Sequence, residues 1–196
     1  MYNCIFSGHC TNSMCDKSCP TLAETTYLLE RNNINMSSEV FRSDKHTIDR
    51  YYDMLKENEG KLTTIISSDT VKTADLITYC GICHKWKGSR LHCTVYNLRY
   101  SQYVDSIRSS WSTNVESEEL EYMRIWSHTA SILVISNLDY VNFRDFECQT
   151  LLSLIQDRSS KNLTTVVVTP NTSSLVGKSP FFGTLTSLLM KGVNDR

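Results

Sequence analysis

Two uninterrupted apolar runs in the second half of the chain constrain its fold more than any other feature. They lie in the segments SILVISNL (131–138) and LTTVVVTPN (163–171). Strands that are apolar without alternation are buried on both faces, which is the environment of a parallel sheet covered by helices. The segment between them, FRDFECQTLLSLIQDRSSKN, is typical of a helix. We therefore predict a three-layer α/β domain with a parallel sheet.

The alternation of strands and helices begins at Lys61. KLTTIISS predicts a strand, residues 70–87 a helix that stops at Gly88, and RLHCTVYNLRY a further strand. Two helices are expected before this domain, PTLAETTYLLERNNI with a Thr21–Glu24 capping box and SDKHTIDRYYDMLKENEG with Gly60 as its stop. The expected organisation is a cysteine-rich segment plus helix over 1–36, a linking helix over 37–60, and the α/β domain over 61–196.

Composition and charge narrow the class of protein. Of the 196 residues, 40% are hydrophobic and 21% are charged, which are values of globular chains. The net charge of -1 gives no general attraction to nucleic acid or anionic lipid. No apolar run approaches a membrane span, and the N-terminus lacks the basic and apolar regions of a signal peptide. We expect a cytoplasmic protein without membrane contact.

Four of the eight cysteines gather near the N-terminus, with the spacing C-x5-C-x4-C-x3-C. In a reducing cytosol such a cluster indicates a metal site rather than disulfides. Zn²⁺ bound by four thiolates is the leading interpretation, and a [4Fe–4S] cluster is the alternative because the last cysteine precedes Pro20. Unligated cysteines are the third option. The candidate ligands are Cys4, Cys10, Cys15 and Cys19.

The segment IISSDTVKTADLI (65–77) has the layout of a Walker A phosphate loop, G-x-x-x-x-G-K-[ST], with Lys72 and Thr73 at the helix start. Both defining glycines are replaced, by Ile66 and Val71. Branched side chains there obstruct the close approach of backbone amides to phosphates. Asp69 adds a negative charge beside the expected position of a polyanion. The loop therefore predicts weak or absent ATP binding.

Three segments in this order resemble the AAA+ ATPase core of bacterial and phage replicative helicase loaders (DnaC/DnaI/IstB-like) over about residues 60–190. They are SSDTVKTADLI, ASILVISNLDY and LLSLIQDRSSKNLTTVVVTPN. The resemblance implies a P-loop NTPase fold of AAA+/RecA type and places Asn171 where the family contacts the γ-phosphate. It further implies a role in DNA replication of a bacterium, phage or mobile element, with a replicative helicase or a loader as protein partner. The DnaI-type loaders also carry an N-terminal zinc module, with a different ligand spacing.

The chain differs from that family at the residues that catalyse ATP hydrolysis. Ser136 and Asn137 stand where the Walker B motif has acidic residues, and neither replaces a carboxylate in holding Mg²⁺ or polarising water. The helix FFGTLTSLLM contains no arginine finger. Together with the altered phosphate loop, these losses predict a pseudo-ATPase, a non-hydrolysing interaction module. The alternatives are an active ATPase with an unorthodox phosphate loop and an iron–sulfur redox or sensor protein.

Two further groups of residues are candidate contacts to nucleic acid or to a partner. Single-stranded DNA is often bound by cations that contact phosphates and aromatic rings that stack on bases. The segment HKWKGSRLH contains three cations and one such ring, namely Lys85, Lys87, Arg90 and Trp86. Arg158 and Lys161 stand where a ring-forming AAA+ protein presents charges to its neighbour or to DNA. The competing interpretations are a solvated loop and a polar helix end. Cys80 and Cys83 form a C-x2-C pair near a helix end, for which we favour packing over redox chemistry.

Overall fold

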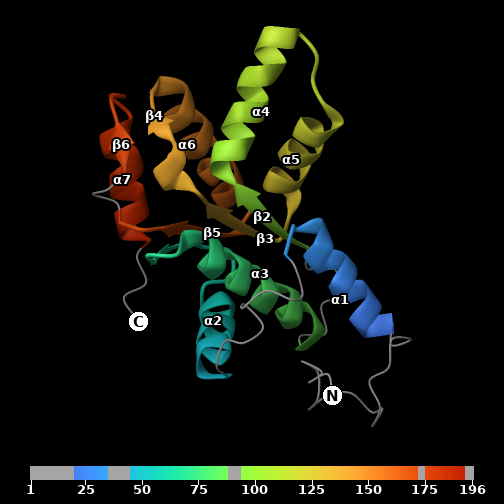
Figure 1. The fold of residues 1–196 in the computed structure, drawn as a ribbon. Helices are drawn as coiled ribbons and strands as arrows, with labels where there is room; N and C mark the ends of the chain where they lie inside the picture. The colour runs from blue at the N-terminus through green and yellow to red at the C-terminus, as the bar shows by residue number, and fades with distance from the viewer. Residues whose placement is uncertain (1–19, 35–44, 88–93, 172–174, 193–196) are drawn as a thin grey trace.

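A four-stranded parallel sheet forms the centre of the protein (Figure 1). The computed structural model describes residues 20–34, 45–87, 94–171 and 175–192. The sheet has the order β1-β5-β3-β2, and every neighbouring pair is parallel. Its strands are β1 (Leu62–Ile66), β2 (Val95–Arg99), β3 (Ile132–Ser136) and β5 (Thr164–Thr169). The predicted α/β fold with a parallel sheet is confirmed.

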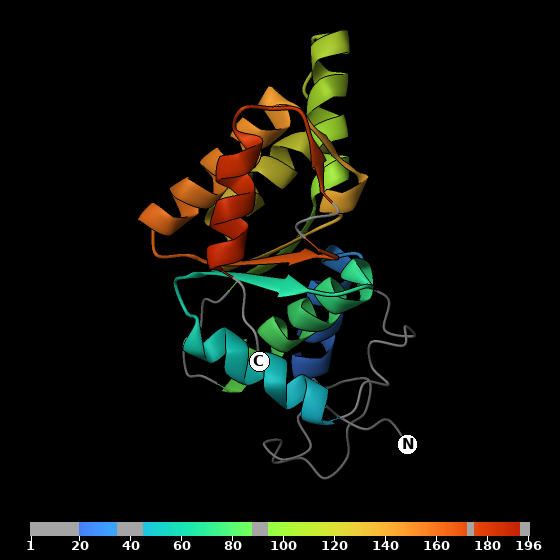
Figure 2. The same ribbon diagram turned by 90° about the vertical axis from the view of Figure 1, so that its left-hand side faces the viewer.

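Helices cover both faces of the sheet, as Figures 1 and 2 show. One face carries α1 (Pro20–Arg31), α2 (Lys45–Glu57) and α3 (Thr70–Lys87). The other carries α4 (Tyr100–Thr113), α5 (Glu118–Thr129), α6 (Asp145–Ser160) and α7 (Phe182–Lys191). None of the described helices combines the length and the apolar character that crossing a membrane requires.

The central strands divide their side chains between two cores. In β3, Leu133 and Ile135 belong to the core under α4–α7, and Ile132 and Val134 belong to the core under α1–α3. This follows from the period of two along a strand, and it explains why a doubly covered strand is apolar at every position. Burial on both faces is therefore the physical origin of the two apolar runs in the sequence.

The outer edge of β2 is covered by the end of α1. The Asn32 side chain accepts a hydrogen bond from the Asn97 amide (2.7 Å) and donates one to the Val95 carbonyl (3.3 Å). One amide side chain thus substitutes for part of a neighbouring strand, which protects an edge from pairing with other chains. Leu29 and Ile34 are buried in the same core as Ile77 of α3. The helix expected to belong to the cysteine-rich segment therefore packs on the α/β layer structure.

Two short strands lie outside the main sheet and were not expected from the sequence. β4 (Asn142–Phe143) pairs in parallel with β6 (Val176–Gly177), after a 3-10 turn, η2 (Leu138–Tyr140). Gly177 leaves room for the ring of Phe182, because a Cβ there would lie 2.2 Å from Phe182 Cδ2. Two-residue strands leave no periodic pattern in a sequence, so this pairing could only come from the three-dimensional packing.

Candidate functional site

The connection from β1 to α3 is short and lies at the carboxyl edge of the sheet, where open α/β sheets bind ligands. Between the end of β1 and the start of α3 stand only the three residues Ser67–Asp69. The Ser67 amide donates to the Thr169 carbonyl (3.0 Å), which prolongs the pairing of β1 with β5 beyond the strand. The loop therefore remains close to the sheet and does not open into a wide cradle.

Asp69 caps the N-terminus of α3 with its own carboxylate. Its Oδ1 accepts a hydrogen bond from the Lys72 amide (2.9 Å), and its carbonyl accepts one from the Thr73 amide (3.1 Å). The hydroxyls of Ser67 and Thr73 bond to each other (2.7 Å). A helix N-terminus attracts anions through its free amides. Here the amide of Lys72 and the hydroxyl of Thr73 are engaged by residues of the same loop.

Replacing Asp69 with alanine should lower the free energy of unfolding by about 1 kcal/mol, the usual contribution of an N-cap side chain. The Asp69→Asn variant retains an oxygen acceptor for the Lys72 amide and should lose much less, because Asn and Asp are comparable caps. Urea denaturation followed by far-UV circular dichroism measures both variants. Equal losses in the two variants would show that the cap hydrogen bond is not what Asp69 contributes.

Negative charge accumulates in the first two turns of α3. Asp75 is partly buried, and burial raises its pKa to about 6. The positive charge of Arg99 and a hydrogen bond from Asn97 Nδ2 (2.9 Å) lower that pKa, whereas the charge of Asp69 raises it further. Asp69 and Asp75 thus place two carboxyl groups near the start of α3, where the Walker A pattern has its lysine. Coulomb repulsion at this short range works against a bound triphosphate.

The neighbouring strands end in neutral polar residues. Ser136 is the last residue of β3 and is fully buried, and Asn137 follows in a left-handed conformation (φ 61°). Asp139 lies in η2 and is exposed. Asn171 is exposed two residues beyond β5. Lys72, Thr73 and Asn171 therefore all lie at the carboxyl edge of the sheet. No carboxylate stands at the end of β3, so a Mg²⁺ ion would find no acidic ligand there.

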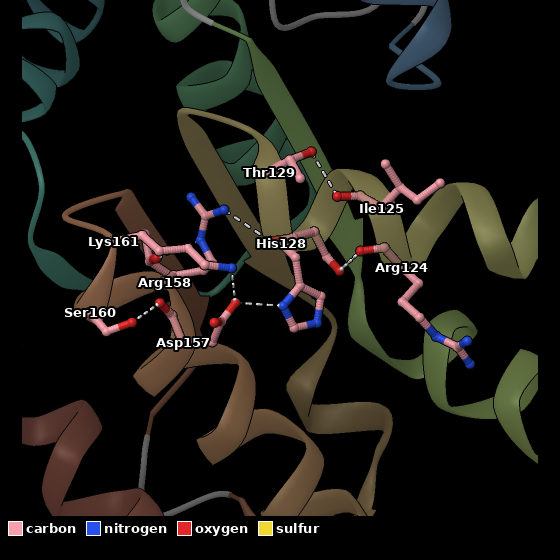
Figure 3. Close-up of polar contacts among 10 residues, drawn as sticks. Arg124, Ile125, His128, Thr129, Asp157, Arg158, Ser160 and Lys161 are labelled. Atoms are coloured by element: carbon pink, nitrogen blue, oxygen red, sulfur yellow. Dashed lines mark hydrogen bonds and ion pairs between the residues drawn. The ribbon is translucent and has the colours of Figure 1, made fainter.

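The Arg158 side chain is fully buried beside the amino end of β5, away from this edge. Figure 3 draws its polar surroundings. Its guanidinium donates to Thr165 Oγ1 (2.9 Å), to the Ser127 carbonyl (2.9 Å) and to the Thr164 carbonyl (2.7 Å). Burial lowers its pKa to about 10, an effect that the charge of Asp157 partly offsets. The prediction that Arg158 contacts DNA or a partner is wrong, because its side chain joins α5, α6 and β5 and does not reach the surface.

Lys161 is exposed and takes part in a small charge cluster, also drawn in Figure 3. Its Nζ and His128 Nδ1 each lie 2.7 Å from the same carboxylate oxygen of Asp157, Oδ2. These hydrogen bonds, that of His128 above all, hold the pKa of the Asp157 carboxyl below its usual value. The cluster is at the amino ends of β3 and β5, so Lys161 does not share the candidate site of Lys72.

Several predicted residues are beyond what the structure describes. Cys4, Cys10, Cys15, Cys19 and Arg90 fall outside the described ranges. Lys85, Trp86 and Lys87 form the end of α3, and only their backbone is described. Within the described ranges, no group of three or more His, Cys, Asp or Glu residues is arranged to hold a metal ion. Cys80 is buried in the core under α1–α3, in agreement with a packing role.

Comparison with known proteins does not assign the chain to a family. No model of a protein family matches the chain, and no curated protein matches it either. The case for any function therefore depends on the arrangement of residues at the β1–α3 junction and on the other surfaces of the fold.

Proposed function

We propose that the protein is a non-hydrolysing, helicase-loader-like interaction module that acts in the DNA replication of a bacterium, phage or mobile element. Its partner would be a replicative helicase or a loader, met in the cytoplasm. The observation that carries the proposal is the Asp69 cap. The Asp69 carboxylate accepts a hydrogen bond from the Lys72 amide, which in a phosphate loop would be available to a nucleotide. The α/β core would then serve as a scaffold for binding.

The arrangement of the sheet supports the loader-like part of the proposal. β5 lies between β1 and β3, so the strand that leads to Asn171 separates the phosphate-loop position from the Walker B position. This order is compatible with a P-loop-like core. Since fold does not determine function, the support for the absence of hydrolysis comes separately, from Asp69, Asp75 and the neutral end of β3.

The binding surfaces of this module remain proposals from the sequence. The N-terminal segment would bind Zn²⁺ through Cys4, Cys10, Cys15 and Cys19. Metal binding would supply the stability that so short a segment lacks, and the folded segment would bind the partner. Lys85, Trp86, Lys87 and Arg90 would provide a second contact, to single-stranded DNA. An active ATPase and an iron–sulfur protein are the competing functions.

One anoxic preparation of the whole chain separates the three functions. We expect about one zinc ion per chain by metal analysis and no visible absorbance. Titration with a fluorescent ATP analogue and Mg²⁺ should not saturate at micromolar concentrations, and size-exclusion chromatography should show a complex with a replicative helicase. Micromolar, Mg²⁺-dependent binding with turnover that Lys72→Ala abolishes would establish the ATPase. Iron with brown colour would establish the cluster.

A further inference from the structure

At the edge of the sheet opposite β1, the end of α1 and the carboxyl end of β2 meet the first two turns of α4 and α5 (Figure 1). They border two adjoining hollows, an inner one of about 170 Å³ and a more open outer one of about 620 Å³. The residues that line both hollows are Asn33, Arg99, Gln102, Glu119 and Met123. After Asn33 the chain turns into the core under α1–α3, where Ile34 is buried. We call the two hollows together the β2-edge pocket.

Part of the β2 edge is already paired as it would be with a neighbouring strand. The Thr94 carbonyl accepts a hydrogen bond from the first amide of β3 (3.0 Å), so the backbone groups one, three and five residues later point outward. The Asn32 side chain holds the first two of these groups, the Val95 carbonyl and the Asn97 amide. The next two are the Asn97 carbonyl and the Arg99 amide, and no described residue forms a hydrogen bond with either. A ligand of one residue's length can therefore continue the pairing that Asn32 begins.

Two opposite charges line the pocket without an ion pair. Arg99, at the end of β2, and Glu119, in the first turn of α5, border both hollows. In the described ranges neither side chain forms an ion pair. Arg31, a further cation of the lining, donates a hydrogen bond to the Tyr122 hydroxyl, and its guanidinium carbon lies 3.6 Å from the centre of the Trp126 ring. A simple anion would meet the charge of Glu119 and a simple cation that of Arg99, so a molecule with both charges fits better.

We propose that the β2-edge pocket binds a free α-amino acid with an uncharged side chain. Its ammonium group donates to the Asn97 carbonyl and lies beside the Glu119 carboxylate. Its carboxylate accepts a hydrogen bond from the Arg99 amide and pairs with the Arg99 guanidinium. These are the two backbone bonds that one residue of a parallel strand would make, with a charged partner added at each end. The site does not depend on the proposed role in replication.

The size and the lining of the inner hollow support a ligand of this class. Sites for drug-sized molecules usually have about 300–1,000 Å³, so a hollow of about 170 Å³ suits a smaller occupant. Its lining includes Leu98 and Tyr122 beside Asn32, and these neutral residues favour an uncharged side chain. A charged side chain would bring a third charge beside Arg31 or Asp105, both of which already have partners.

Isothermal titration calorimetry of the whole chain with L-leucine and L-glutamine tests the proposal. We expect at least one of them to bind with a dissociation constant below about 1 mM. Its N-acetyl derivative lacks the ammonium charge and its α-carboxamide derivative lacks the carboxylate, so each should bind at least about tenfold more weakly. Hydrogen exchange of the Arg99 amide should slow when the amino acid is bound. No binding of either amino acid, equal binding of the derivatives, or unchanged exchange at Arg99 would overturn the proposal.

Matched variants locate the binding site. Glu119→Gln should weaken binding at least about tenfold, whereas Glu118→Gln, on the same turn of α5 but outside the lining, should not change it. Gln102→Trp should fill the pocket and abolish binding, whereas Ser109→Trp, two turns later on α4 and likewise exposed, should leave binding intact. Circular dichroism checks that each variant is folded. Equal effects within either pair, or binding that survives both Glu119→Gln and Gln102→Trp, would contradict the site.

Discussion

Replacing Arg158 with alanine is expected to lower the free energy of unfolding by about 3–5 kcal/mol. The guanidinium is fully buried and makes hydrogen bonds to two carbonyls and a hydroxyl, on α5 and β5. The substitution leaves a cavity in place of a long side chain and removes the donors of three buried acceptors. Since domains of this kind are stable by only about 5–15 kcal/mol, a large part of the stability would be lost.

Urea denaturation monitored by circular dichroism measures this effect. Arg158→Lys keeps a charge but loses the planar fork that reaches three acceptors, so it should also be strongly destabilising. Lys161→Ala is the matched surface control, because the side chain of Lys161 is exposed and forms an ion pair with Asp157; it should change stability by less than about 1 kcal/mol. Similar urea midpoints for the Arg158→Ala variant and the unchanged chain would show that the buried network is not structurally important.

The central strands of this fold can be predicted from the sequence because a strand buried on both faces consists of consecutive apolar residues. ILVI in β3 and VVV in β5 are apolar on consecutive residues, and the structure buries them between two helical layers. The order of the strands and the β4–β6 pair depend on contacts between distant segments, which no local pattern encodes. Arg158 illustrates the same limit: its three acceptors lie on Ser127, Thr164 and Thr165, and only the folded chain brings them together.

The sequence names Lys72, Thr73 and Asn171 as candidate nucleotide contacts, and in the fold all three stand beyond the carboxyl ends of β1 and β5. The hydrogen bonds among the residues of the β1–α3 loop could not be read from the motif. The comparison with the Walker A motif treats Asp69 only as a charge that repels phosphate, whereas in the fold its carboxylate caps α3. An aspartate directly before a helix is also a typical N-cap, and that signal was present in the sequence. The pKa of Asp75 could not be foreseen, since it results from burial against β2.

The Asp75→Asn variant should be more stable than the unchanged chain at pH 8, by on the order of 2 kcal/mol, and about equally stable at pH 4. Burial raises the folded-state pKa of Asp75 from 3.8 to about 6, in spite of the opposing charge of Arg99. The folded protein thus holds this proton more tightly than the unfolded chain. The stability that Asp75 contributes is fully present below pH 4 and is lost as the pH rises through about 6.

Asparagine cannot ionise, so the variant avoids this loss and retains an oxygen that can accept the hydrogen bond from Asn97 Nδ2. The measurement is urea denaturation of both proteins between pH 4 and pH 8, with Asp139→Asn as a control at an exposed position of η2. A stability difference that stays constant over this range would contradict a raised pKa. A difference that grows between pH 4 and pH 6 would show that α3 carries a buried carboxylate at a cost in stability. Such a carboxylate, beside Asp69, would make the start of this helix unfavourable for any phosphate.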